Sequence, residues 1–564
     1  MAVSSSKKGV QLLVSHFVQL GIKHIVFSPG SRNAPLVIAF NNHTFFSSIV
    51  IPDERSAAFY ALGMAQQLNE PVALVCTSGS AVLNYYPAVA EAFYQNIPLI
   101  VLSADRPLDW IDQGDGQTIR QENVLKNHVR YYTALRENHH SNSDLLYNSR
   151  EIATAFHHCN GTVKGPVHIN FPFTEPLYGK EEFDNTLEQI KPTQIADNKQ
   201  LIPNEELIRL KESWKNTAKI MVLVGQHQPN PQLLNALKAL NNLPNVAIVA
   251  ENTSNMIDRD FVNCIDRTLN GIAENEQADF APELLITLGG AIVSKKIKQY
   301  FRTFKPKEHW KIGHEFPYMD TYQSLTKSIQ MNASDFIELL GSFPSNSNSN
   351  FGNKWKQKDF IQEEKAREYL FNLDTFCDLK VFDLLLDCVP EDSHLHLANS
   401  SVVRYSQLFT PIRSINYWCN RGTSGIDGSM STAAGASLIS KNKAHTLIIG
   451  DMSFFYDSNA FWQQLKLSNL RVFLINNGGG DIFNIIQGPN TTTELDINFV
   501  YKHTFNAEGI CQAYNVRYFK ATTLQEIENR MAEFYTETED GAFVMEIFTN
   551  EVNNSSELKK LMIV

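Results

Sequence analysis

The sequence has no apolar run near the roughly 18 residues that a membrane-spanning helix needs, and it has no excess of positive charge. Lysine and arginine total 49 against 60 aspartate and glutamate residues, a net charge of -11. This balance argues against a nucleic acid or an anionic membrane surface as partner. It leaves acidic substrates open, because a few arginines in one cleft can outweigh a negative surface.

Cysteine is scarce, and the spacing of the cysteines does not indicate a disulfide framework. The seven cysteines are scattered and form no C-x-x-C pair, which favours reduced thiols in a cytoplasmic protein. Residues 1–21 lack the unbroken apolar stretch of a secretory signal, since glutamine, serine and histidine interrupt them. We therefore expect an amphipathic helix at the N-terminus.

Short apolar runs, each followed by a turn of small residues and a helical stretch, recur along the whole chain. Runs without alternation that are separated by helices are typical of parallel strands buried on both faces. The sequence therefore predicts an α/β fold built from doubly wound parallel sheets. The runs lie at 22–31, 71–80, 97–107, 219–226, 245–252, 283–290, 445–453 and 470–480.

Two polar segments divide the chain, which at 564 residues is too long for one hydrophobic core. Residues 176–203 lack a strong period and are interpreted as a linker, and residues 343–353 are rich in serine and asparagine and are interpreted as a loop. We expect three units, at 1–185, 200–343 and 354–564.

Polar residues close two neighbouring strands in the last third of the chain. Gly450-Asp451 ends one apolar run, and Asn476-Asn477 ends the next after 24 intervening residues. Mg²⁺ prefers about six oxygen ligands, which the Asp451 carboxylate, the Asn477 amide and the Gly479 main-chain carbonyl could share with a bound diphosphate. Ordinary turn residues after strands are the alternative.

This spacing resembles the signature of thiamine diphosphate enzymes, whose cofactor also needs a carboxyl group against its pyrimidine ring. Glu54 is the candidate, because it stands where a strand ending at Pro52-Asp53 meets a helix with apolar neighbours. Burial there would raise its pKa and favour the proton-donating form. A plain acidic residue at a helix N-terminus is the alternative interpretation.

Further segments resemble one family of these enzymes, the 2-succinyl-5-enolpyruvyl-6-hydroxy-3-cyclohexene-1-carboxylate synthases of menaquinone biosynthesis. The resemblance implies three domains of the thiamine diphosphate enzyme type. It also implies thiamine diphosphate with Mg²⁺ or Mn²⁺, and a homodimer with shared active sites that could pair into a tetramer. The implied reaction decarboxylates 2-oxoglutarate and adds the resulting carbanion to isochorismate. The matching segments are SPGSRNAPL (28–36), DERSAAFYALGMA (53–65), TSGSAVLNYYPAV (77–89), SADRP (103–107), GQTIRQ (116–121), NSSVVR (399–404), NRGTSGIDG (420–428) and GDMSFFYDSNA (450–460).

The resemblance also implies roles for individual residues. Both substrates carry carboxylates, which guanidinium groups bind bidentately, although a surface salt bridge is the alternative for any one arginine. Lys295 is the implied lysine, with Lys296 as a one-residue alternative. The implied substrate contacts are Ser31, Arg32, Arg106, Gln117, Lys295, Ser400, Arg404, Arg421, Ile482 and Phe483. The implied cofactor contacts are Pro29, Glu54, Ile426, Gly450, Asp451, Met452, Ser453, Asn477 and Gly479.

Three positions depart from the expected patterns. Met452 replaces the glycine that often follows Gly-Asp, and Gly116 stands where a polar residue could contact substrate. His139-His140 resembles a histidine pair of 2-oxo acid decarboxylases but lies in a polar loop, so we interpret it as solvated. Two rival functions remain: another thiamine diphosphate carboligase or decarboxylase, for instance one acting on pyruvate, and a non-catalytic metabolite-binding protein on the same scaffold.

Overall fold

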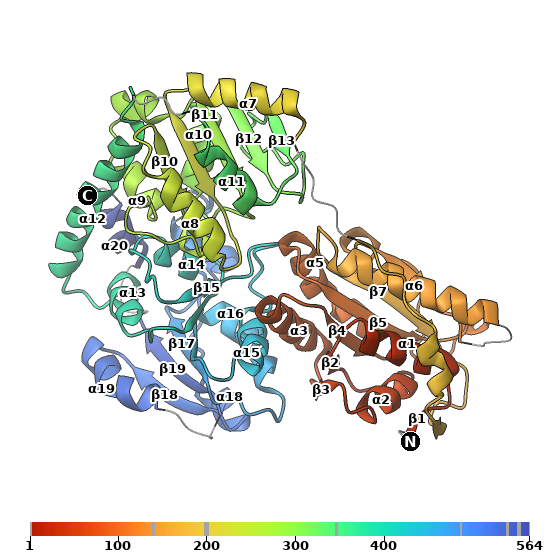
Figure 1. The fold of residues 1–564 in the computed structure, drawn as a ribbon. Coiled ribbons are helices and arrows are strands. Elements are labelled where there is room, and N and C mark those ends of the chain that lie inside the picture. The colour runs from red at the N-terminus through yellow and green to blue at the C-terminus, as the bar shows by residue number, and fades with distance from the viewer. Residues whose placement is uncertain are drawn as a thin grey trace.

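Three parallel sheets with helices on their faces make up the protein (Figure 1). The computed structural model describes residues 3–137, 142–196, 202–344, 348–485, 488–536, 541–549 and 554–562. Each of the apolar runs singled out in the sequence contains a strand, and these strands pair in parallel. The predicted α/β class is therefore confirmed.

The first sheet has six strands in the order β3-β2-β4-β5-β7-β6. Its strands are β2 (His24–Phe27), β3 (Ser47–Val50), β4 (Val72–Cys76), β5 (Leu99–Asp105), β6 (Tyr132–Ala134) and β7 (Val167–Pro172). Its helices are α1 (Lys8–Gln19), α2 (Ala34–Asn41), α3 (Glu54–Leu68), α4 (Ala81–Asn84), α5 (Tyr86–Gln95) and α6 (Asn142–Asn160). Helix α1 confirms the amphipathic helix expected at the N-terminus, with Val10, Leu13 and Phe17 buried.

The second sheet has five strands in the order β10-β9-β11-β12-β13. Its strands are β9 (Ile220–Val224), β10 (Val246–Ala250), β11 (Leu284–Leu288), β12 (Glu308–Ile312) and β13 (Lys327–Ile329). Its helices are α7 (Asn204–Asn216), α8 (Pro231–Leu240), α9 (Ile265–Asn270), α10 (Lys295–Thr303), α11 (Ala333–Gly341) and α12 (Phe351–Phe371).

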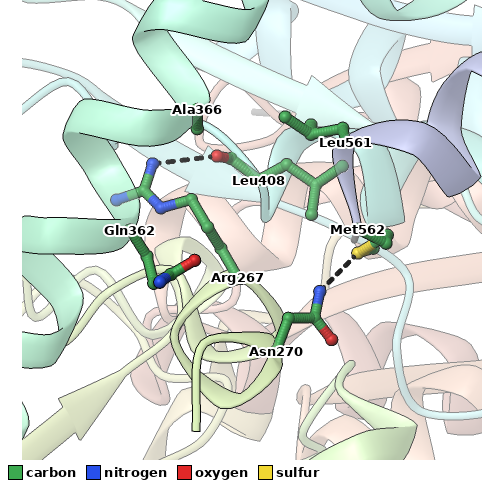
Figure 2. A pocket seen from close by; sticks show the side chains of 7 residues that line it. All are labelled: Arg267, Asn270, Gln362, Ala366, Leu408, Leu561 and Met562. Carbon is green, nitrogen blue, oxygen red and sulfur yellow. Dashed lines mark hydrogen bonds between the residues drawn. The ribbon is translucent and has the colours of Figure 1, made fainter. Parts of the chain in front are cut away.

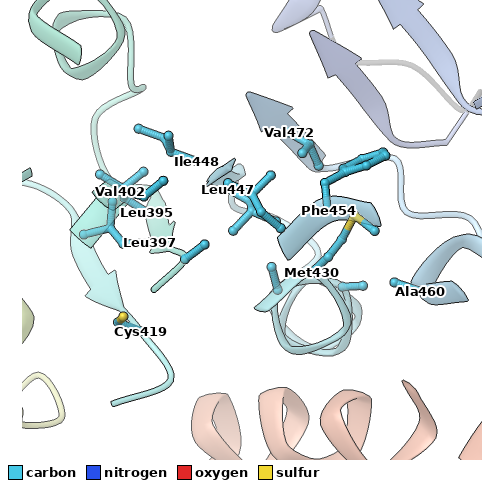
Figure 3. Close-up of a cluster of buried hydrophobic side chains, with 14 of the residues drawn as sticks. Leu395, Leu397, Val402, Cys419, Met430, Leu447, Ile448, Phe454, Ala460 and Val472 are labelled. Carbon is cyan, nitrogen blue, oxygen red and sulfur yellow. The ribbon is translucent and has the colours of Figure 1, made fainter. Parts of the chain in front are cut away.

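The third sheet, in the order β15-β14-β16-β17-β19-β18, repeats the strand order of the first when each is numbered along the chain. Figure 3 shows part of its core, with Leu447 toward Met430 and Phe454 and Ile448 toward Leu395 and Val402. Its strands are β14 (His394–Leu397), β15 (Asn416–Trp418), β16 (His445–Gly450), β17 (Leu470–Asn476), β18 (Arg517–Ala521) and β19 (Phe543–Phe548). Its helices are α13 (Asp378–Asp387), α14 (Ser401–Ser406), α15 (Ser429–Ile439), α16 (Asp451–Tyr456), α17 (Ile482–Ile485), α18 (Glu508–Ala513), α19 (Leu524–Phe534) and α20 (Asn554–Leu561).

Two segments interpreted as connections contain regular structure. Within the predicted linker 176–203, β8 (Lys180–Glu182) pairs antiparallel with β1 (Val3–Ser5). This strand escaped prediction because its three side chains are polar and exposed. Within the predicted loop 343–353, helix α12 already begins at Phe351, since Phe351 and Trp355 bury their rings in the core of the middle sheet.

The first and third sheets are joined by two helices whose backbones nearly touch (Figure 1). A Cβ atom placed on Gly63 of α3 would lie 1.9 Å from the Thr432 carbonyl oxygen, and one on Gly435 of α15 would lie 2.0 Å from that of Tyr60. Only glycine permits this approach at either position. Helix α3, which begins at Glu54, is thus held directly against the third sheet's layer.

The C-terminal helix docks on the middle layer through a small hollow (Figure 2). There Arg267 donates a 3.0 Å hydrogen bond to the Leu408 carbonyl, and the Asn270 amide lies 2.9 Å from the Met562 sulfur. None of the site residues expected from the sequence lines this hollow. Among the described residues, we find no helix that combines the length and apolarity required to cross a membrane.

Candidate active site

The two polar pairs expected to hold a metal meet at the carboxyl edge of the third sheet. Strands β16 and β17 are neighbours, with Gly450 beside Ile475 in the parallel register. One oxygen of the Asp451 carboxylate accepts hydrogen bonds from the backbone N–H groups of Gly478 and Gly479, each at 3.0 Å. The structure thus brings together the end of one strand and the glycine turn after the next.

The Asn477 side chain is oriented by a residue that sequence reasoning missed. Its amide nitrogen donates a 2.9 Å hydrogen bond to the carboxylate of Asp378, the first residue of α13. The amide oxygen is left for another partner. Asp378 precedes Asn477 by 99 positions and stands in no recognisable motif, so nothing in the sequence pointed to it.

The turn after β17 requires glycine at position 479. Gly479 has φ 150°, and a Cβ there would lie 2.7 Å from the Val500 carbonyl oxygen. Gly450 is not crowded in this way, because a Cβ atom placed on it would meet no atom within 4 Å. There is open space at the end of β16, beside the oxygen groups of Asp451 and the turn.

Negative charge is concentrated and poorly compensated at this edge. Burial raises the pKa of Asp378 to about 7, with Asp481 and Asp451 contributing their negative charge. Burial, reinforced by Asp451, also raises the pKa of Asp481, and one buried oxygen of Asp481 has no hydrogen-bond partner among the described residues. The available ligands are oxygens, and three aspartates meet here with Lys559 as an opposing charge on Asp481, which fits a hard divalent cation.

His503, also missed in the sequence, closes this site from a following loop. Its Nε2 atom lies 3.2 Å from the Asp451 carboxylate, and its backbone N–H donates a 3.0 Å hydrogen bond to the Gly478 carbonyl. Its ring stacks on Phe505 with centroids 5.4 Å apart. A single histidine in a polar stretch carries no sequence signal that separates it from a surface residue.

The expected cofactor residues around Asp451 are linked to one another. The Ser453 hydroxyl donates a 2.7 Å hydrogen bond to the Ile426 carbonyl, and the Met452 N–H bonds the Asp451 carboxylate at 2.6 Å. The side chain of Ile426 is half-buried. These bonds fix the 420–428 segment against the start of α16, while Pro29 is exposed in the turn after β2 of the first sheet.

Glu54 is the first residue of α3 and is half-buried. Burial raises the pKa of its carboxyl group, against opposing hydrogen bonds from its own backbone N–H and the Asn84 side chain. Its neighbours fix the helix start to α16 of the third layer: Arg55 donates a 2.7 Å hydrogen bond to the Tyr456 carbonyl, and Asn459 donates one of 2.7 Å to Asp53.

Four of the expected substrate residues lie at the carboxyl edge of the first sheet. One of their hydrogen-bond donors has no partner in the part of the chain that the structure describes. Arg32 is 7% exposed, and its Nε is buried without a hydrogen-bond partner among the described residues. Arg106 bonds the Gly116 carbonyl at 2.8 Å and pairs with Asp115 at 2.7 Å. Ser31 and Gln117 are exposed, and Gln117 has a positive φ of 54°.

Two further arginines approach each other at the carboxyl edge of the third sheet. Burial and the nearby charge of Arg421 lower the pKa of Arg404. Arg421 is 8% exposed and bonds the Asn399 side chain at 2.9 Å, and its buried Nε has no hydrogen-bond partner among the described residues. Ser400, whose carbonyl accepts from Arg404, has φ 71° and ψ -126°. A buried and a half-buried guanidinium, with Asp266 as the opposing charge near Arg404, favour an anionic ligand.

The middle sheet sends a loop toward these arginines. Burial raises the pKa of Glu251 to about 7, and its carboxylate accepts from the backbone N–H groups of Val293 and Ser294, at 2.6 and 2.7 Å. The next residue, Lys295, begins α10 and is exposed, whereas the Lys296 amine is bonded to Asn270. This difference leaves Lys295 freer to meet a ligand.

The segment that carries Arg421 is held by all three layers. Glu91 of α5 accepts hydrogen bonds from the backbone of Gly422 and Thr423, at 2.7 and 2.6 Å. Gln226 of the middle layer donates one of 2.6 Å to the Cys419 carbonyl. Arg421 and Gly422 also border a cavity of about 940 Å³ between the middle and first layers.

The apolar residues after the metal turn form a short helix. Ile482 is buried at the start of α17, and the Phe483 ring lies 5.6 Å from that of Phe499. His139 and His140 lie outside the described residues.

Comparison with protein families gives three matches, which together cover most of the chain and leave residues 125–194 unmatched. Residues 7–124 match a model described as "Thiamine pyrophosphate enzyme, N-terminal TPP binding domain". Residues 195–397 match "Middle domain of thiamine pyrophosphate", and residues 400–547 match "Thiamine pyrophosphate enzyme, C-terminal TPP binding domain".

Curated relatives carry one common name. The chain is 43% identical over 530 residues to the 2-succinyl-5-enolpyruvyl-6-hydroxy-3-cyclohexene-1-carboxylate synthase of Flavobacterium psychrophilum, covering 94% of each chain. It is 41% identical over 557 residues to the same synthase of Christiangramia forsetii, covering 95% of each. With that of Flavobacterium johnsoniae it shares 41% identity over 547 residues, covering 96% of each.

Proposed function

The chain belongs to the 2-succinyl-5-enolpyruvyl-6-hydroxy-3-cyclohexene-1-carboxylate synthase family of thiamine pyrophosphate enzymes, and on this basis we propose its reaction. It is a transferase that removes CO₂ from 2-oxoglutarate and joins the remaining four-carbon unit to isochorismate, in menaquinone biosynthesis. The observation that supports the proposal is the edge of the third sheet, where the oxygens of Asp451 and the glycine turn lie on strand ends neighbouring those of Arg404 and the buried Arg421.

We propose that thiamine diphosphate is held through Mg²⁺ or Mn²⁺ by the Asp451 carboxylate, the Asn477 amide oxygen and the Gly479 carbonyl. When bound, this cofactor supplies the nucleophilic carbon and stabilises the negative charge left by decarboxylation. The open space at Gly450 leaves room for the diphosphate. Ile426 and Ser453, joined by a hydrogen bond, would support the middle of the cofactor, and Pro29 and Met452 would complete its contacts.

Glu54 would hydrogen-bond the pyrimidine ring of the cofactor. Burial raises the pKa of this carboxyl group, so it holds a proton at higher pH than an exposed glutamate does and can act as the donor. The bonds of Arg55 and Asp53 to the third layer hold the helix that presents it.

The substrate carboxylates would be bound by arginines that keep part of their hydrogen-bonding capacity free, although Arg32 already donates to the Phe173 carbonyl and Arg421 to Asn399. Buried Nε atoms without partners on Arg32 and Arg421 are the support for this assignment, because a buried unpaired donor is costly unless a ligand satisfies it. Ser31, Arg106, Gln117, Lys295, Ser400, Arg404, Ile482 and Phe483 are assigned to the same substrate site.

The arrangement of chains is also part of the proposal. We propose a homodimer with shared sites that can pair into tetramers, because large apolar side chains are exposed near both edges: Val50 and Trp110 in the first layer, and Tyr456 and Phe505 in the third. We also propose that the three functional units span residues 1–185, 200–343 and 354–564. We propose further that the protein is located in the cytoplasm.

The test is consumption of isochorismate, followed by its absorbance, with thiamine diphosphate, Mg²⁺ and 2-oxoglutarate. Loss of isochorismate that needs all three additions supports the proposal. Release of CO₂ from another 2-oxo acid such as pyruvate, with isochorismate untouched, would reassign the chain to a different carboligase or decarboxylase. An unchanged melting temperature with cofactor and metal would indicate a binding protein without this chemistry.

A further inference from the structure

We propose that Asp378 is a positioning residue of the metal site, which holds Asn477 so that its amide oxygen, and not its amide nitrogen, faces the metal. The inference rests on the proposed function, because it takes Asn477 as a metal ligand. Asp378 lies outside all of the sequence segments that predicted the site.

The contact between the two side chains fixes a direction. Asp378 is 2% exposed, and its Oδ2 atom accepts the hydrogen bond from Asn477 Nδ2 at 2.9 Å. A carboxylate has no N–H group to donate, whereas an amide has one accepting end and one donating end. When Asp378 is ionised, the form that a bound cation favours, Asn477 turns its NH₂ group toward it and its oxygen away from it.

The carboxylate itself is held from the opposite side. Its second oxygen accepts a hydrogen bond from the Thr549 hydroxyl, and the Asp378 backbone N–H donates one of 2.7 Å to Asn554. The Asn554 amide bonds the Thr549 carbonyl at 3.0 Å. Residues just after β19 and at the start of α20 thus keep the acceptor in place beside Asn477.

Shape alone cannot set this orientation. The two ends of an asparagine amide are nearly equal in size, so an amide turned by 180° fits the same space. In the turned state two N–H groups would face the metal, and Mg²⁺ binds oxygen. Groups behind a metal ligand commonly change metal affinity 10- to 100-fold when they are removed, as an order of magnitude.

The alternative explanation is that Asp378 affects metal binding only through its negative charge. Substitutions can distinguish this effect of charge from the positioning of Asn477. Asp378→Leu and the smaller Asp378→Ala remove the acceptor and the charge. Asp378→Asn removes the charge but keeps an acceptor for Asn477, since its own NH₂ can donate to the Thr549 hydroxyl, which accepts as well as donates. Thr549→Val is the matched control, because it removes a bond to the same carboxylate and leaves Asn477 untouched.

The experiment is titration of Mn²⁺ into each variant with saturating thiamine diphosphate, with free Mn²⁺ followed by electron paramagnetic resonance. Near-ultraviolet circular dichroism confirms folding, and Asp378→Ala replaces Asp378→Leu if the latter does not fold. We expect Mn²⁺ binding about tenfold or more weaker without the acceptor, and near-wild-type binding for Asp378→Asn and Thr549→Val.

Equal losses in Asp378→Asn and Asp378→Leu would overturn the positioning role in favour of charge. Unchanged binding in Asp378→Leu, or an equal loss in Thr549→Val, would also overturn it. Failure of the wild-type protein to bind Mn²⁺ would instead overturn the metal site of the proposed function, so the two failures are distinct.

Discussion

The Ser400 carbonyl accepts a hydrogen bond from the guanidinium group of Arg404, one helical turn further along the chain. Ser400 itself has φ 71° and ψ -126°, a backbone conformation that favours glycine. Such a strained residue costs on the order of 1–3 kcal/mol and is typical of functional sites. The strain places the Ser400 hydroxyl and the Arg404 side chain at the same strand end.

This strain predicts that two small substitutions at Ser400 differ in their effect on stability. Ser400→Gly should raise the free energy of unfolding by about 1 kcal/mol, because it relieves the backbone, whereas Ser400→Ala should not. Both should weaken substrate binding alike, because both lose the hydroxyl. Denaturant unfolding and KM measurements check this. An equal stability for the two variants would contradict a strained Ser400.

Replacing the activating carboxyl group should strongly lower turnover and leave the metal site intact. We expect Glu54→Gln to lower kcat by roughly 10²- to 10⁴-fold, the usual contribution of a proton-transferring group. Binding of Mn²⁺ should remain, because Glu54 belongs to the first layer. Asp53→Asn tests the helix start, since it keeps a capping oxygen but loses the acceptor of the Asn459 bond, and we expect the smaller loss of turnover from it. Comparable losses in both variants would show damage to the helix start.

The neighbouring guanidinium groups of Arg404 and Arg421 predict that one substitution raises stability and lowers substrate affinity. Arg404→Gln should stabilise the ligand-free protein, because it removes a cation beside Arg421. It should raise KM for the carboxylate substrates about 10- to 150-fold, the equivalent of a lost charged hydrogen bond. Thermal unfolding and steady-state kinetics test both effects. Arg120→Gln, on an exposed side chain paired with Asp112, should change neither.

Glu251 predicts a pH dependence of stability. Burial raises its pKa from 4.5 to about 7 in the folded state, so its contribution is fully present below the unfolded pKa and is lost as pH rises through about 7. The stability advantage of the wild type over Glu251→Gln should therefore shrink between pH 5 and pH 8. Urea unfolding across this range measures it. Parallel curves, like those expected for the exposed control Glu494→Gln, would refute the assignment.

The close contact of α3 and α15 predicts a large penalty for one methyl group. Gly435→Ala should destabilise the protein by about 1–3 kcal/mol or more, because the new Cβ would overlap the Tyr60 carbonyl. Gly509→Ala, also in a helix, has open space within 4 Å and should gain up to about 1 kcal/mol from helix propensity. Calorimetry of the two variants distinguishes packing from propensity.

Residues at strand ends could be found from the sequence because two signals coincide there. The buried strands are unbroken apolar runs, and a polar residue directly after such a run has to lie at the carboxyl edge of a parallel sheet. Asp451 and Asn477 were predicted in this way, and the strands that carry them were predicted for the same reason.

Residues that act from outside this pattern could not be found. Asp378 begins a helix far from the metal motif, and Glu251 follows a strand of another layer without any motif around it. Their meaning depends on which backbone groups and amides the fold places beside them. Strand β8 escaped for the related reason that edge pairing with β1 needs no apolar side chains.

The bonds between Glu91 and the backbone of Gly422 and Thr423 join residues 331 and 332 positions apart. During synthesis at roughly 5–20 residues per second, the earlier residue emerges on the order of 15–70 s before its partner. In that interval the first layer carries a carboxylate that has not met its donors. The loop of Arg421 can therefore take its final shape only after about three-quarters of the 564 residues have been made, and a chain terminated before Thr423 never forms these bonds.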